Sequence, residues 1–537
     1  MTKTSSQESL FDKVNKEFLQ QIESLREVLP LTMILINGNK AKSTRDFLDY
    51  AKSRGKEDKD DKGEKIYTFS PEDSHVVTAL QKNSEIASTA AEILPNSLFV
   101  SLISQYDNFL GKVIREIFKV SPQILNSSDK ILTFSKLLEL NDIEEAKELI
   151  IEKEIESILR ESHTSHFNWL EEKLKIPLRK DLPVWQTFIE ITERRNLFVH
   201  CDGVVSSQYL NICKKNEVKF EDEVFIGTEL KATPAYFETA YKCLYEISTK
   251  LTQVIWRKLV PKDIEKADAS LNDVCFDLIR NGHYDLADIL LDFATRVLPK
   301  HYNEETKNVF IINQALSLKL GGKKEKAEKI ILDKDWSATN NKFKIAKETL
   351  LENFDQVANL MRLIGANGEI KKIDYKTWPL FIEFRKTQHF TEAFKDVFNE
   401  EYTLVETPKK LLDEIMIDLS NSRKGNLKLN IDSFLEITKK LFPTYEFISY
   451  RAEQFVNDIL EISNLSKNAF QKILQVNLKT VKDYNQFVIF KTPTNYLNPY
   501  TMIRHCVYLS DKEKFAKLLF DGQISNFESW LKEANFK

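Results

Sequence analysis

Residues that break helices are scarce in this chain, and this scarcity constrains its fold more than any other feature. Only 13 glycines and 14 prolines occur among 537 residues. Long stretches therefore run without a turn signal, which favours helices over the short strands and tight turns of an all-β fold. Because a chain of this length is too long for one compact core, we expect a mainly α protein with two to four domains.

Charge and cysteine content narrow the class of protein further. The net charge of −4 and the pI near 6.2 are not those of a general nucleic-acid coat protein. A local basic groove would still suffice for phosphate contact. The five cysteines are scattered and form no CxxC pair, so neither a disulfide framework nor a zinc site is expected; they are Cys201, Cys213, Cys243, Cys275 and Cys506.

Several signals that would give a specific location or chemistry are absent. The first 18 residues contain no apolar core of a signal peptide, and no stretch reaches 18 consecutive apolar residues. We therefore expect a cytoplasmic protein with no membrane contact. No GxxxxGK[ST], GxGxxG, HExxH or GxSxG motif is present. ATP hydrolysis, dinucleotide redox chemistry, zinc proteolysis and α/β-hydrolase chemistry are thus not expected, nor is any cofactor or metal.

The first predicted region spans residues 1–94 and is helical. Apolar residues recur at helical spacing between residues 7 and 29. The run RGKEDKDDKGEK at 54–65 has no apolar residue to anchor it. It is therefore predicted to be a charged, solvated and mobile loop.

The second predicted region spans residues 95–262 and is a helical bundle. Pro95 is predicted to begin an amphipathic helix that ends before Pro122, and another helix runs from Val184 towards Gly203. The stretch VKFEDEVFIGTEL at 218–230 alternates apolar and polar residues, which predicts a small β-hairpin insertion. Thr233-Pro234 then supplies an N-cap and a first-turn proline for a long final helix that ends before Pro261.

The third predicted region, 263–537, is an α-helical repeat domain. The stretch NGHYDLADILL at 281–291 resembles the turn and second helix of a tetratricopeptide repeat. Looser copies occur at 321–332, 352–361 and 387–398, at offsets of about 30 to 40 residues that are typical of helical-hairpin repeats. The repeats are predicted to continue, in degraded form, to the C-terminus.

The sharpest chemical signal lies in the helix before Gly203. Its apolar stripe runs through Trp185, Ile189 and Thr192, and the helical period then places Arg195 and Asn196 on the same inward face, followed by Val199. A buried arginine is costly unless it meets an anion or a carboxylate. Asn196 lies one turn before His200, which is close to the helix end, where its side chain can reach a cleft.

A second irregularity occurs in the Pro95 helix, where Asp107 interrupts an apolar face between Ile103 and Leu110. Such a carboxylate is a natural partner for Arg195 or His200, in a structural or a catalytic role. Two further arginine–histidine pairs at similar spacing, Arg160–His166 and Arg296–His301, lack this context. His163 and His166 have no nearby cysteine and only ordinary acids, so no metal site is expected there.

The segment ERRNLFVHCDGVVSSQYL, residues 193–210, resembles the active-site motif of the HEPN-family ribonucleases. An Arg-Asn pair precedes a Val-His, and a glycine, a β-branched residue and a Tyr-Leu follow. The resemblance covers roughly residues 95–262. It implies a HEPN-like bundle, a homodimer with two facing Arg–His sets, and metal-independent cleavage of RNA by the substrate's own 2′-hydroxyl.

In the roles that this resemblance implies, His200 is the general acid or base, Arg195 binds the phosphate and Asn196 orients His200 or the RNA backbone. Asp107 and Arg194 would support them. By family analogy such an enzyme is a toxin or antiphage-defence effector whose repeat region binds a protein or ligand trigger. The alternatives are structural: His200 as a helix-end histidine, Arg195 as the ion-pair partner of a buried acid, and the whole chain as a non-catalytic dimerisation module and repeat scaffold for a protein partner.

Overall fold

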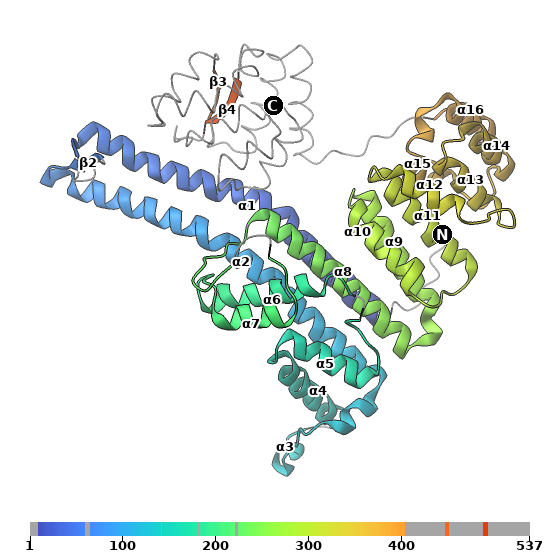
Figure 1. Ribbon diagram of the computed structural model, residues 1–537, viewed down its shortest axis with the longest axis horizontal. Helices are drawn as coiled ribbons and strands as arrows, with labels where there is room; N and C mark the ends of the chain where they lie inside the picture. Colours follow the sequence, from blue (N-terminus) through green and yellow to red (C-terminus); the bar gives the residue numbers. More distant parts are fainter. Residues whose placement is uncertain are drawn as a thin grey trace.

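The chain is mainly α-helical over the part described by the computed structural model, which comprises residues 9–59, 65–140, 142–180, 182–220 and 224–402 and two later strands (Figure 1). The helices up to the end of the bundle are α1 (Leu10–Arg54), α2 (Ser74–Val120), α3 (Phe134–Leu138), α4 (Ile143–Leu159), α5 (His163–Leu174), α6 (Trp185–His200), α7 (Ser207–Lys215) and α8 (Pro234–Leu259). Those that follow are α9 (Ile264–Arg280), α10 (Tyr284–Asp292), α11 (Glu304–Leu320), α12 (Lys324–Leu332), α13 (Asn341–Leu350), α14 (Phe354–Ile364), α15 (Lys372–Thr377) and α16 (Gln388–Phe398). The strands are β1 (Lys56–Lys59), β2 (Lys65–Thr68), β3 (Glu446–Tyr450) and β4 (Phe487–Lys491), in two antiparallel pairs.

Helix α2 is the centre of the bundle, because α1, α4, α6 and α8 all pack against it. About half of the residues in its C-terminal half are buried, and Phe99, Tyr106 and Val113 are inaccessible to solvent. Helix α8 begins as the sequence predicts: the Thr233 hydroxyl accepts a hydrogen bond from the Tyr236 amide, and Pro234 occupies the first turn. The bundle therefore rests on amphipathic helices that bury their apolar stripes against one another.

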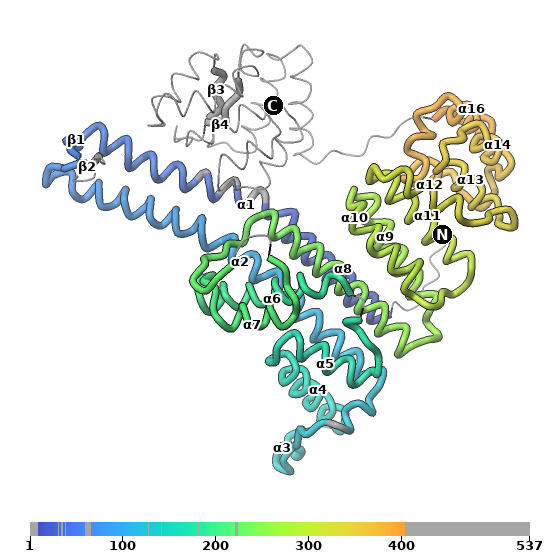
Figure 2. Tube along the Cα trace, viewed as in Figure 1, coloured from blue at the N-terminus to red at the C-terminus, as the bar shows by residue number. Residues whose placement is uncertain are grey.

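The N-terminal half of α2 extends beyond the bundle and pairs with α1 as a long two-helix arm (Figure 2). The prediction that Pro95 begins a helix is wrong, since α2 begins at Ser74 and Pro95 is buried inside it. The boundary predicted at 94/95 thus falls within one helix. Proline is tolerated there because the surrounding turns and tertiary contacts hold the helix on both sides of the missing N–H.

The tip of the arm carries β1 and β2, which pair in register from Lys56 opposite Thr68 to Lys59 opposite Lys65. The charged stretch 54–65 is therefore a strand in part and not entirely a loop, although every β1 residue is exposed as expected. Residues 60–64 of that stretch lie outside the described residues. Backbone pairing with β2, and not burial, gives this stretch its structure.

Among the described residues, one helical segment, Pro71–Val120, is long and apolar enough by length and composition to cross a membrane. The same composition is typical of a core helix, and the part of α2 beyond Leu98 is packed inside the bundle. The absence of membrane contact stays a prediction.

The β-hairpin predicted at 218–230 is not present in the described part of this segment. Val204 and Glu229 form a single isolated bridge, and turns at Phe225–Thr228 replace a second strand. Residues 221–223 lie outside the described residues. The apolar residues that produced the alternating pattern, including Val218, Phe220 and Leu230, instead pack onto a small separate core around Tyr209 and Cys213.

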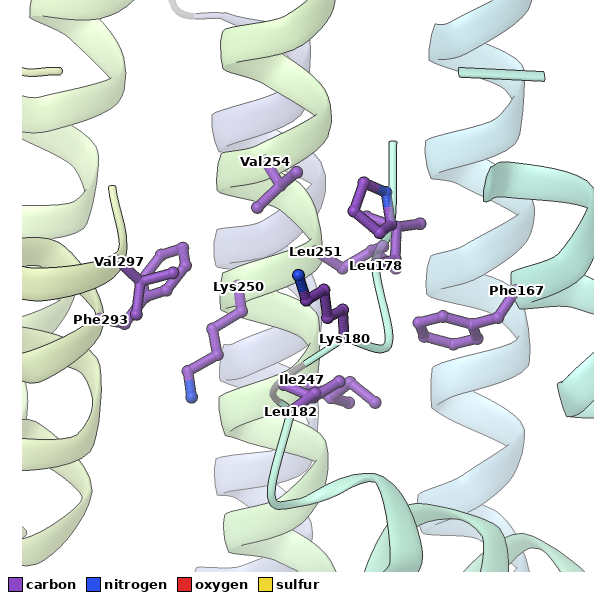
Figure 3. Close-up of a pocket in the computed structure, with 11 residues that line it drawn as sticks. Phe167, Leu178, Lys180, Leu182, Ile247, Lys250, Leu251, Val254, Phe293 and Val297 are labelled. Atoms are coloured by element: carbon purple, nitrogen blue, oxygen red, sulfur yellow. The ribbon is translucent and has the colours of Figure 1, made fainter. Parts of the chain in front are cut away.

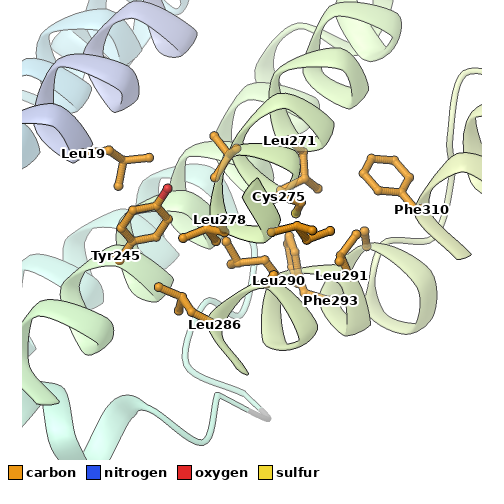
Figure 4. Close-up of a cluster of buried hydrophobic side chains, with 14 of the residues drawn as sticks. Leu19, Tyr245, Leu271, Cys275, Leu278, Leu286, Leu290, Leu291, Phe293 and Phe310 are labelled. Carbon is orange, nitrogen blue, oxygen red and sulfur yellow. The ribbon is translucent and has the colours of Figure 1, made fainter. Parts of the chain in front are cut away.

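From α9 to α16 the chain forms helical hairpins, and each predicted repeat start coincides with a turn and the beginning of a second helix: α10, α12, α14 and α16. Gly282 and Gly322 adopt positive φ angles of 81° and 79° in the first two turns, and Glu352 adopts 63° in the third. Leu278, Leu286 and Leu290 fill the first hairpin, and one continuous core joins them to Leu19 and Tyr245 of the bundle (Figure 4).

The predicted continuation of the repeats to the C-terminus falls mostly outside the described residues. The two described segments beyond residue 402, β3 and β4, are strands and not helices.

Candidate functional site

Helix α6 carries most of the predicted site residues and lies between α2, α5, α7 and α8. It ends at His200, where the amides of Cys201 and Gly203 both donate to the Leu197 carbonyl. Gly203 has a φ of 80°, and its carbonyl accepts a hydrogen bond from the Leu230 amide. This glycine turn satisfies the last carbonyls of α6 and fixes the chain that follows it.

Arg195 projects from α6 towards α2 and lies near Asp107, with 3.8 Å between its Nη2 atom and Asp107 Oδ2. Its Nη1 atom donates a hydrogen bond to Asn196 Oδ1 at 3.1 Å. The side chains of Arg195 and Asp107 are 26% and 28% exposed, so solvent reaches both. The Arg195 Nε atom is buried and has no hydrogen-bond partner among the described residues. The guanidinium group therefore keeps unused donors beside a half-buried carboxylate.

His200 is exposed at the end of α6 and makes no hydrogen bond or ion pair with another residue in the described ranges. Val199 is also 46% exposed, so the inward stripe predicted to continue through it ends a turn earlier. Thus Asp107, Arg195 and Asn196 come together, whereas His200 lies at the open end of the same helix, five residues beyond Arg195.

Arg194 belongs to a separate, buried network. Its Nε atom donates to Glu190 Oε1 at 2.7 Å, and its guanidinium carbon lies 3.8 Å from the centroid of the Tyr236 ring. Glu190 also accepts hydrogen bonds from the hydroxyls of Tyr209 (2.6 Å) and Tyr236. This carboxylate joins α6 to α7 and α8, so Arg194 holds the helix in place and does not face solvent.

Two histidines of α5 that the sequence did not point to are part of the cluster. His163 Nε2 lies 2.9 Å from Asp107 Oδ1, and its side chain is only 10% exposed. The ring of His166 is 5.1 Å from that of His163 and is almost completely buried. The signal that could have found them is their helical spacing with Phe167 and Leu170, which places all four on the buried face of α5.

Burial shifts the protonation of this cluster. It lowers the pKa of His166 to about 4, and the electrostatic influence of the neighbouring His163 adds to the effect. The carbonyls of Ile158 and Glu161 oppose it, although neither ring nitrogen makes a well-formed hydrogen bond. Burial also raises the pKa of Glu193 above its usual value, while His163 and a hydrogen bond from Asn196 oppose that rise. At neutral pH His166 is therefore uncharged.

In the two other arginine–histidine sequence pairs, the arginines Arg160 and Arg296 are exposed, whereas the histidine side chains are buried. Arg160 is at the C-terminal end of α4 and is 80% exposed, whereas His166 is buried on α5. His301 Nε2 donates a hydrogen bond to the Ala294 carbonyl at 2.9 Å, its Nδ1 atom lies 2.9 Å from Asp268 Oδ1, and only 6% of its side chain is exposed. Asp268 further binds Arg257 and the Tyr302 amide. This satisfied set joins α8 to α9 and leaves no group open to a substrate.

A shallow cavity of about 110 Å³ lies between the 177–182 loop, α8 and the η4 turn (Phe293–Val297) that follows α10 (Figure 3). Most of its lining is apolar, with Lys180 and Lys250 as the charged members. Lys250 already pairs with Glu246 at 2.5 Å. The cavity does not include Arg195 or His200.

The cluster of Asp107, His163, Arg195 and Asn196 combines an anion-binding group with titratable groups at a partly open surface, which is the chemistry that phosphate binding and proton transfer require. Within the described ranges, no group of three or more His, Cys, Asp or Glu side chains could hold a metal ion. No family model, no curated protein and no solved structure matches this chain.

Proposed function

We propose that this chain is a metal-independent HEPN-type endoribonuclease. The observation that supports it best is the placement of Arg195 on α6: it has unused N–H donors, faces solvent in part, and lies beside Asp107 and Asn196. Arg194, in contrast, is 13% exposed and is held between Glu190 and the Tyr236 ring, as a purely structural arginine would be. The exposed His200 lies on the same helix.

In this proposal the 2′-oxygen of the RNA attacks the adjacent phosphorus, and the bond from phosphorus to the 5′-oxygen breaks. A histidine base accepts the 2′-hydroxyl proton, and a histidine acid donates a proton to the departing 5′-oxygen. The products are a 2′,3′-cyclic phosphate and a free 5′-hydroxyl. Arg195 binds the non-bridging oxygens as their charge increases. A homodimer would supply both roles from two copies of His200, one from each chain.

The biological part of the proposal is a cytoplasmic toxin or antiphage-defence effector. The helical hairpins from α9 to α16 would bind the protein or ligand trigger. They share a continuous core with the bundle, so a change in the hairpins would be transmitted by direct packing against α8.

A second candidate function is a non-catalytic scaffold. The observation in its favour is an unpartnered apolar segment around α3, where four large side chains are between 71% and 84% exposed: Ile131, Phe134, Leu138 and Ile143. Exposed apolar groups at this density are typical of protein-binding surfaces.

An RNA-cleavage assay in the presence of EDTA distinguishes the ribonuclease from the scaffold. The wild type is compared with His200→Ala and Arg195→Lys, of which the second keeps the charge but loses the planar fork of donors. We expect cyclic-phosphate products from the wild type and a loss of about 100-fold or more in each variant. His389→Gln serves as the control, because His389 is a half-exposed histidine of α16 far along the chain from α6.

His200 has no partner among the described residues, so its replacement should leave the thermal midpoint unchanged. Full activity in both folded variants, or no cleavage by the wild type in EDTA, would exclude catalysis by these residues and leave the scaffold as the better reading.

A further inference from the structure

Asp107 lies between two basic side chains of very different kinds, His163 and Arg195. Its Oδ1 atom is within hydrogen-bond distance of His163 Nε2 at 2.9 Å, whereas its Oδ2 atom is 3.8 Å from Arg195 Nη2. The second distance is too long for a hydrogen bond and leaves only charge attraction. The tighter partner of Asp107 is therefore a titratable group on α5, and the looser partner is the arginine that would bind phosphate.

The protonation state of His163 sets how much of the Asp107 charge acts on Arg195. An ionised carboxylate only accepts hydrogen bonds, so the Nε2 atom of His163 must carry a proton in both states. When the ring is neutral, the full negative charge of Asp107 acts on Arg195, and the pair is electrically balanced. When the ring is protonated, the imidazolium neutralises Asp107, and Arg195 is left as the uncompensated cation at the surface.

The charged and titratable groups that surround His163 come from three helices. Asp107 and the Tyr106 ring face it from α2, His166 from α5, and Glu193 and Arg195 from α6. His166 is uncharged at neutral pH, and burial favours the neutral form of Glu193. The ring of His163 keeps 10% side-chain exposure, so protons can exchange with solvent.

We propose that His163 is a positioning residue that, through Asp107, controls whether Arg195 is available to an RNA phosphate, so that phosphate binding strengthens as the pH falls. The inference rests on the proposed function for the identity of the anion. It differs from that function in the residue it names, because His163 lies outside the Arg–His motif and does not itself contact RNA.

The test uses the full chain and an RNA oligonucleotide with 2′-O-methyl groups, which cannot be cleaved because the attacking hydroxyl is blocked. Its Kd is measured by fluorescence anisotropy from pH 8 to pH 5.5, at constant salt. His163→Gln retains an amide donor towards Asp107 but does not titrate. Arg195→Gln removes the proposed phosphate ligand, and His389→Gln controls for loss of an exposed histidine on α16.

We expect the wild type and His389→Gln to bind about tenfold more tightly at the acidic end, as one additional uncompensated charge at the phosphate contact would give. His163→Gln, compared at temperatures where its melting curve shows it to be folded, should lose most of this gain, and Arg195→Gln should bind weakly at every pH. If His163→Gln follows the same pH profile as the wild type, or if the wild type does not bind the oligonucleotide at all, the inference is wrong.

The two proposals fail in different experiments. A His163-dependent binding profile without cleavage of unmodified RNA would keep the positioning role and remove the ribonuclease. Cleavage that requires His200 and Arg195, together with a binding profile that His163→Gln leaves unchanged, would keep the ribonuclease and remove the positioning role.

Discussion

At the scale of single residues, buried polar groups affect the stability of this bundle, and His166 is the clearest case. It is 1% exposed, and burial lowers its pKa to about 4 from an ordinary 6.5. Above pH 6.5 the ring is neutral in the folded and the unfolded chain, and its effect on stability is constant. Between pH 6.5 and about 4 only the unfolded chain takes up the proton, so the folded state loses stability as the pH falls.

We therefore predict that the free energy of unfolding of the wild type decreases by up to roughly 3 kcal/mol over this interval because of His166 alone. In His166→Leu this part of the pH dependence should disappear. Urea titrations at pH 7 and pH 4.5, followed by tryptophan fluorescence, measure it. His389→Leu, at a half-exposed histidine, should keep the wild-type slope; an equal slope in His166→Leu would contradict the assignment.

The candidate site was partly predictable from single residues. Asp107 and Arg195 could be paired from the sequence because each interrupts an apolar stripe, and the structure places them 3.8 Å apart. His163 was not found, because its local sequence ESHTSH looks like a polar surface. Only the arrangement of α5 against α2 brings it to Asp107. The partner of a buried charge is a tertiary property, which sequence spacing along one helix does not contain.

At the scale of elements, sequence prediction succeeded where the signal is local and failed where packing decides. Turns before α10 and α12 were recognisable because Gly282 and Gly322 supply the left-handed conformation that the turn needs. Pro95 gave a false helix start, because α1 and the bundle stabilise α2 on both sides of it. The stretch 218–230 alternates like a strand but buries its apolar residues on a small core beside α7.

The stability of the segment after α6 depends on Gly203, because this residue fixes the direction in which the chain leaves His200. A Cβ atom at Gly203 would lie 2.7 Å from the Leu230 carbonyl oxygen, at a φ of 80°. Gly227 is the matched control: its φ is 91°, but nothing lies within 4 Å of an added Cβ. Gly227→Ala should cost only the conformational strain, about 1–2 kcal/mol.

Gly203→Ala should cost clearly more, roughly 3 kcal/mol or above, because the Leu230 carbonyl must also move and its amide loses the hydrogen bond to the Gly203 carbonyl. Urea unfolding of both variants checks the difference. Similar losses of stability in the two would mean that the segment around Leu230 adapts freely and does not constrain the end of α6.

On the scale of the whole molecule, the bundle and the helical hairpins are joined by more than a linker. A continuous apolar core runs from α1 and α8 into α9 and α10. Beside it, Arg26 of α1 donates from Nε to Glu238 of α8 at 2.7 Å and lies 3.4 Å from His283, in the turn between α9 and α10. The guanidinium also stacks over Tyr241 at 5.1 Å. The Arg26 side chain thus connects α1 and α8 of the bundle to the first hairpin.

If the hairpins control the site on α6, this connection must be stable, and Arg26→Ala should loosen it. Losing a charge-assisted hydrogen bond and the contact with His283 should cost about 1–2 kcal/mol at the junction. Amides of the 281–284 turn should then exchange with deuterium about tenfold faster, because 1.4 kcal/mol corresponds to a factor of ten. The α2–α6 contact should keep its protection.

Arg280→Ala is the control for this experiment, since Arg280 is 62% exposed and its ion pair among the described residues is with Asp277 of its own helix. Burial lowers the pKa of His283, and the charge of Arg26 adds to that effect. His283 is therefore neutral near pH 7, and Arg26 meets no repulsion there. Equal exchange in Arg26→Ala and Arg280→Ala would show that the apolar core alone holds the first hairpin against the bundle, and that any signal from the hairpins must pass through α8 and α9.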